Sequence, residues 1–116
     1  MTIRVDRELE GSLAAKAHGR MVVIDAYRSW NCGTWVGDLT ARFADTAPRD
    51  AFIAAEPIEG VPVMIRDTLP ALLDAAGASL HGGGILRRDG LRVELDRPEL
   101  WIDWLANPGR KHATPG

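Results

Sequence analysis

The stretch MVVIDAYRSWNCGTWVGDLTARF, residues 21–43, decides the fold of this chain. Residues 21–27 are rich in Val, Ile and Tyr without interruption, which favours a strand. From Trp35 to Phe43 apolar and polar residues alternate, the period-two pattern of a strand with one buried face. We therefore predict two strands joined by the turn Trp30-Asn31-Cys32-Gly33-Thr34-Trp35, with Cys32 at one end of the sheet.

Three stretches around this hairpin show the apolar spacing of helices. The first expected helix is 6–18, which buries Leu9, Leu13 and Ala17. The second is entered at 67–70, is ended by Gly77 and buries Leu69, Leu72, Leu73 and Ala76. The third is capped by 96–99, is stopped by 107–109 and buries Leu100, Trp101, Trp104 and Leu105. Asp67 or Thr68 is expected to be the N-cap of the second helix, and Pro70 fits its first turn because proline lacks an N–H group.

The remaining apolar runs predict further strands, at 51–55, 60–65, 85–88 and 91–95. Pro62 is expected to place its strand at a sheet edge. Asp89-Gly90 predicts a type I′ turn that pairs residues 85–88 with residues 91–95. His81-Gly82-Gly83-Gly84 is expected to be a flexible loop in front of that hairpin.

Composition limits the class of protein. With 116 residues, 46% hydrophobic and 26% charged, the chain fits one α+β domain, residues 1–109, with a mostly antiparallel, curved sheet and a flexible tail, residues 110–116. The net charge of −2 with interspersed signs argues against a nucleic-acid partner, and the apolar runs are too short for a membrane span. A single cysteine cannot close an intramolecular disulfide, which agrees with a cytoplasmic protein.

The turn around Cys32 is the candidate site, because reactive thiols usually lie in partly exposed polar turns. Gly33 would let a ligand approach the main chain closely, and Arg28 would lend the turn positive charge. Trp30 and Trp35 would wall a pocket or a protein interface. The plainer alternatives stay open: an unreactive cysteine, a solvated arginine and two core tryptophans.

A cysteine in such a turn can act as a nucleophile or as a metal ligand. If His81 lay beside it, the pair would make a thiol enzyme with Cys32 as nucleophile and His81 as base. A structural zinc site is not expected, because His18, His81, His112 and Cys32 lack the close spacings of zinc ligands.

Several segments resemble the A-type iron–sulfur carrier (HesB-like) domains. The matching segments are 21–27 leading to Cys32-Gly33, 35–43, 60–65, 69–73 and 90–98. The family's late strand ends in Asn-Pro and is followed by Cys-Gly-Cys, whereas here Pro98 is followed by Glu99-Leu100-Trp101-Ile102. Asn31 also replaces the family's glycine before the cysteine, so only Cys32 carries over as a metal ligand.

This resemblance implies a compact β-rich fold and a non-enzymatic binding or scaffold module with a Cys32-dependent role in iron–sulfur handling. A cluster normally needs about four ligands, so one cysteine per chain would hold it only together with another chain or a partner. A homodimer and a protein partner are both open, and a protein-interaction domain anchored by Trp30 and Trp35 is a further alternative.

Overall fold

The computed structural model describes residues 3–83 and 90–108. In chain order its elements are β1 (Ile3–Val5), α1 (Leu13–Ala17), β2 (Met21–Asn31), β3 (Thr34–Ala44), β4 (Phe52–Ile58), β5 (Val61–Arg66), α2 (Pro70–Ala76), β6 (Ala78–Gly82), β7 (Leu91–Leu95) and α3 (Glu99–Ala106). The predicted tail 110–116 and the predicted strand 85–88 lie outside the described residues. None of the helices in the described ranges is long and apolar enough to cross a membrane.

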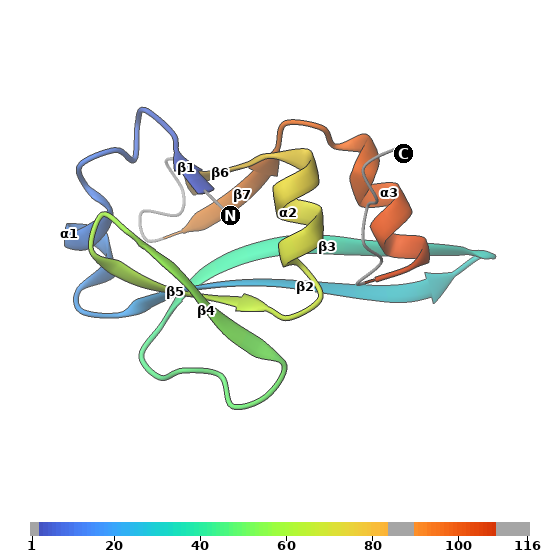
Figure 1. The fold of residues 1–116 in the computed structure, drawn as a ribbon, viewed down its shortest axis with the longest axis horizontal. Helices are drawn as coiled ribbons and strands as arrows, with labels where there is room; N and C mark the ends of the chain where they lie inside the picture. The colour runs from blue at the N-terminus through green and yellow to red at the C-terminus, as the bar shows by residue number, and fades with distance from the viewer. Residues whose placement is uncertain (1–2, 84–89, 109–116) are drawn as a thin grey trace.

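The seven strands form one mixed sheet in the order β1-β6-β7-β3-β2-β5-β4. Four neighbouring pairs are antiparallel, and β1–β6 and β2–β5 are parallel. The sheet is curved, and α2 and α3 lie on the same side of it (Figure 1). The predicted class is confirmed in its general features: the structure is rich in strands, its curved sheet has mostly antiparallel pairs, and its helices are few and short.

The hairpin of β2 and β3 forms the middle of the sheet. Its ladder runs without interruption from Met21↔Ala44 to Asn31↔Thr34, so both predicted strands are confirmed and both are longer than predicted. The outer end of the hairpin extends past the other strands (Figure 1). This projection sets the turn apart from the rest of the molecule.

The core lies between the helices and the face of the sheet that they cover. Its largest fully buried side chains are Leu9, Leu13, Val22, Ile24, Val63, Ile65, Leu69, Leu72, Leu73 and Leu80, joined by Trp104 and Leu105 of α3. Every side chain predicted for the buried face of a helix is buried or packs against this core. Among the described residues no polar or charged side chain is buried, so the core is held by apolar packing alone.

Both of the first two helices begin later than predicted. Residues 7–12 form turns, and Gly11 has a φ of 79°, so only Leu13–Ala17 of the predicted helix 6–18 is helical. The N-cap of α2 is Leu69, without a side-chain cap, rather than Asp67 or Thr68. Pro70 does lie in the first turn of α2, and Gly77 ends that helix.

The predicted edge position of Pro62 is wrong, because β5 lies between β2 and β4. The β4–β5 register shifts between Ala55 and Ile58, so this proline lies opposite an irregularity of the ladder. Proline lacks the N–H that a regular ladder uses, and a bulge is one of the places in a sheet where it fits.

The predicted hairpin of 85–88 with 91–95 involves residues outside the described ranges. Within those ranges β7 pairs with β6 along its whole length and with β3 at the single pair Ala41↔Leu91. His81 and Gly82, predicted to lie in a flexible loop, belong to β6. Ala78 and Leu80 of this strand are buried and alternate with Ser79 and His81, but the pattern covers only five residues and runs into the glycines from Gly82 on, which favour a loop.

An ion pair ties β2 to β5 where their parallel pairing ends. Asp25 of β2 accepts hydrogen bonds from the Arg66 guanidinium and, at 2.7 Å, from the Ala26 N–H group. Burial raises the pKa of Asp25, but these hydrogen bonds and the charge of Arg66 outweigh it and hold the pKa below its ordinary value of 3.8. The carboxylate is therefore stabilised in its ionised form.

We expect Asp25→Asn to lower the free energy of unfolding at pH 7 by about 1–2 kcal/mol, because a charged hydrogen-bond acceptor is lost. A lowered folded-state pKa contributes stability above the unfolded-state pKa, so the difference from wild type should vanish as the pH falls below about 4. Urea unfolding at a series of pH values from 7 down to about 2.5 measures this difference. Asp45→Asn, at an exposed site after β3, should show no such loss. An equal loss at both sites at every pH would contradict the assignment.

Candidate functional site

The turn at the end of the hairpin holds Cys32 in a backbone conformation that is unusual for it. Cys32 and Gly33 have φ values of 52° and 80°, as both central residues of a type I′ turn require. Glycine adopts this conformation freely, whereas a residue with a Cβ is strained there. The Cys32 side chain is exposed, and its thiol lies 3.4 Å from the Asn31 side-chain oxygen.

Two tryptophans face each other next to the turn. Trp30 and Trp35 are directly paired across the strands, with ring centroids 5.2 Å apart in a T-shaped arrangement. The Arg28 guanidinium lies 3.7 Å from the centre of the Trp35 ring and donates a 2.7 Å hydrogen bond to the Leu105 carbonyl near the end of α3. The Arg28 side chain therefore points back to α3. It does not place its positive charge at the Cys32 turn, which the sequence had suggested as one possibility.

The close contact between α3 and the hairpin depends on a glycine. A Cβ on Gly37 would collide with the Tyr27 carbonyl oxygen and would lie 3.1 Å from Leu105 Cδ2. The absence of a side chain at this position lets the end of α3 approach β3. The same region of α3 is fixed to the core by Trp104, whose indole N–H donates to the Thr68 carbonyl at 3.0 Å.

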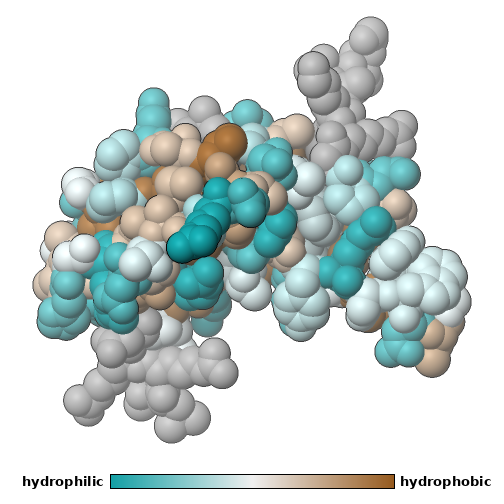
Figure 2. Space-filling model, turned by 90° about the horizontal axis from the view of Figure 1, so that it is seen from below, coloured by the Kyte–Doolittle hydropathy of each residue, from teal (hydrophilic) through white to brown (hydrophobic). Residues whose placement is uncertain are grey.

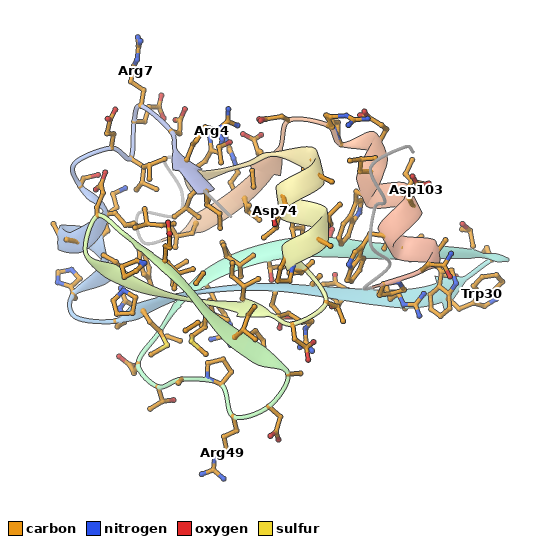
Figure 3. The ribbon with its side chains drawn as sticks, viewed as in Figure 1. Arg4, Arg7, Trp30, Arg49, Asp74 and Asp103 are labelled. Atoms are coloured by element: carbon orange, nitrogen blue, oxygen red, sulfur yellow. The ribbon has the colours of Figure 1, made fainter. Side chains whose placement is uncertain are left out.

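We call residues 27–36, the outer end of the hairpin, the arm. It stands out from the body of the molecule (Figure 2). Trp30, labelled at its end in Figure 3, is 61% exposed, and Tyr27 and Val36 are 58% and 40% exposed. Tyr27 donates a 2.6 Å hydrogen bond to Asp38, whose carboxylate raises the pKa of the phenol. From Ser29 to Val36 the arm contains no charged residue.

The edge of β2 is open along the arm. Pairing with β5 covers Val22 to Ile24, and the next outward-pointing N–H group, that of Ala26, donates to the Asp25 carboxylate. Alternate residues of an antiparallel strand direct their N–H and C=O groups away from its partner, so Arg28 and Trp30 present theirs outward. Within residues 3–83 and 90–108 no hydrogen bond fills these main-chain groups.

The structure does not bring Cys32 and His81 together. His81 lies on β6, next to Gly82, which is level with Leu91 of β7 and through it with Ala41 of β3. From Ala41 the hairpin runs out to Thr34 before it reaches the turn, which is roughly 20 Å along the strand. His81 therefore lies too far away to take the Cys32 proton, and the structure does not form the thiol–imidazole pair of the thiol-enzyme alternative.

His81 instead forms a cluster that the sequence analysis missed. Its Nε2 lies 2.7 Å from Glu94 Oε2 and 2.8 Å from Ser79 Oγ, and its Nδ1 lies 3.6 Å from Asp6 Oδ2. To activate Ser79, His81 would have to accept the hydroxyl proton at Nε2. The Glu94 carboxylate contacts the same nitrogen and can only accept a proton from it, so the cluster does not activate the hydroxyl. The two carboxylates lie at opposite ring nitrogens and do not converge on one metal ion.

Within residues 3–83 and 90–108 no second ligand lies beside Cys32 to complete a metal site. Among the described residues, no group of three or more His, Cys, Asp or Glu side chains is placed to hold a metal ion. The side chains around the turn are the aromatic and amide groups already described, which are poor ligands for iron. An iron–sulfur cluster does not fit the donors that the described part of one chain offers at this site.

A pocket of ≈ 190 Å³ lies at the other end of the contact between α3 and the hairpin. It is lined by Gly37, Asp38, Leu39, Val93, Leu95, Pro98 and Trp101. It forms because the β3–β7 ladder contains a single pair, Ala41↔Leu91, after which the strands separate. Trp30 and Trp35 do not line it, so they do not wall a pocket there, and the volume is below that of typical small-molecule sites.

Comparisons with protein-family models, curated proteins and solved structures found no match to this chain. The HesB-like resemblance therefore stays a prediction from the sequence. The candidate site with the clearest physical character is the arm, which combines exposed aromatic side chains with an open strand edge.

We expect iodoacetamide to label Cys32 in the folded protein, because the thiol is exposed, and we expect His81→Ala to leave the labelling rate unchanged at every pH. Mass spectrometry of samples quenched over time gives the rate. The urea-unfolded chain supplies the reference for a freely accessible thiol. A rate that falls several-fold in His81→Ala would contradict the separation of the two residues.

Proposed function

We propose that this protein is a protein-binding module and that the arm is its binding surface. The observation that carries the proposal is the coincidence, on one projecting segment, of an exposed Trp30 and an unfilled β2 edge. Exposed tryptophans are among the side chains that contribute most to protein interfaces. An open strand edge supplies main-chain hydrogen bonds to an added strand.

The sequence of the arm supports the same proposal. Proteins usually protect an exposed edge with charges, prolines or bulges, because an open edge pairs with other chains. Residues 29–36 contain neither a charge nor a proline, the guanidinium of Arg28 is directed to the Leu105 carbonyl of α3, and the β2–β3 ladder has no irregularity. A segment of this kind is prone to pair with other chains when no specific partner covers it.

The test uses the single thiol as a reporter. A photoreactive benzophenone maleimide is attached to Cys32 at the end of the arm, and the labelled protein is irradiated in an extract of its source cells. We expect discrete adducts whose yield falls tenfold or more in Trp30→Ala, about the effect of losing an interface hot spot. The matched control is Ile102→Ala, which removes a large apolar side chain, 69% exposed, from α3.

The adducts should persist in Ile102→Ala, and circular dichroism should show that both variants keep the fold. If neither substitution changes the adducts, Cys32 has met its neighbours by collision and the arm is not a binding surface. If Ile102→Ala abolishes them as well, binding follows general hydrophobicity and the proposal is wrong.

Iron–sulfur handling is a second proposal, and the exposure of Cys32 at the end of the arm favours it. A thiolate in this position is accessible to ligands from another chain, which the cluster would need. We expect protein purified without oxygen to contain iron and acid-labile sulfide, and Cys32→Ser to lose both. Equal contents in the two samples, including none in either, would contradict a role for Cys32.

A further inference from the structure

We infer that the partner of the arm is a second copy of this chain, joined to the first by antiparallel pairing of the two β2 edges about a two-fold axis at Ser29. This inference rests on the proposed function and names the occupant of the same surface. The outward main-chain groups of Arg28 would pair with those of Trp30 in the second copy, and the reverse. Each of these two pairs exchanges both of its hydrogen bonds, so the outward N–H and C=O groups of Arg28 and Trp30 are all used.

The length of the open edge matches this arrangement. The free part of β2 is bounded on one side by the end of β5, level with Asp25, and on the other by the turn at Cys32-Gly33. With the axis at Ser29, Ala26 lies opposite Cys32 of the second copy. The turn of each copy therefore reaches the end of β5 in the other copy, and the two free edges cover each other completely.

The charge distribution favours a second copy over a foreign strand. A two-fold axis brings each residue near its own counterpart, so like charges directly opposite each other would repel. In this register Ser29, at the axis, is small and exposed, and Arg28, the one charged residue of 26–32, lies opposite Trp30 of the second copy rather than opposite its own counterpart. The Arg28 guanidinium is held against Trp35 and the Leu105 carbonyl of its own chain, which directs this charge away from the axis.

The register makes a test by disulfide formation possible. At the axis the two Ser29 residues form a non-hydrogen-bonded pair, whose Cα atoms lie about 4.5 Å apart, within the range that a disulfide spans. We expect Ser29→Cys in a Cys32→Ser background to form a covalent dimer with oxidised glutathione. The two thiols give two protons and two electrons to one oxidised glutathione, which leaves as two reduced molecules.

Two controls place thiols on the same arm but away from the axis. Val36 is the direct partner of Ser29 on β3 and points to the same face, so Val36→Cys in the Cys32→Ser background separates the thiols by three strand spacings, about 14 Å. In the wild-type protein the two Cys32 residues lie three positions from the axis on either side, roughly 20 Å apart. We expect the covalent dimer at least tenfold faster in Ser29→Cys than in either control.

Sedimentation equilibrium of the unmodified, reduced protein gives the second measurement. We expect a monomer–dimer equilibrium that Trp30→Ala weakens tenfold or more and Ile102→Ala leaves unchanged. Equal crosslinking of the three thiols, preferential crosslinking through Cys32, or a monomer at all concentrations would overturn the inference. If Trp30-dependent adducts with other proteins persist while the protein stays monomeric, the protein-binding function stands and only the second copy is excluded as partner.

Discussion

The uninterrupted ladder between β2 and β3 is the interaction on which the rest of the structure depends. Its inner half supplies Val22 and Ile24 to the core and pairs with β5 and β7 on its two sides. No other strand of the described part of the chain lies beside its outer half, and an isolated two-stranded ribbon is only marginally stable in water. The Trp pair and the hydrogen bond from Arg28 to α3 supply the stabilisation that neighbouring strands provide elsewhere.

The local part of the fold could be predicted from the sequence, and the long-range part could not. The alternation from Trp35 to Phe43 and the leucines of α2 identify their elements because each pattern is decided by residues close in the chain. β1 depends on its parallel pairing with β6, which joins Ile3 to Ala78, and β6 depends on its pairing with β1 and β7. The edge position predicted from Pro62 was wrong for the same reason, because the irregularity of the ladder that accommodates this proline lies in the neighbouring strand β4.

The candidate site divides in the same way. Cys32-Gly33 as a turn between strands follows from local sequence, and so does the contact between Trp30 and Trp35 across it. The distance between Cys32 and His81 depends on the register of three strands, which no pattern in either segment specifies. The open edge of β2 was equally hidden, because it depends on where β5 ends, although the uncharged run 29–36 was a visible signal.

The four tryptophans of the chain occur as two contacting pairs, one in the arm and one in α3. Trp30 and Trp35 are nearly perpendicular, at 75°, whereas Trp101 and Trp104 are stacked, with an angle of 7° between their planes. Indole transitions at such short separation couple to each other, and the sign and strength of the coupling depend on the angle between the rings. The ultraviolet circular dichroism of this protein therefore contains two separate optical signals, one from the projecting hairpin and one from the packed helix, without any added label.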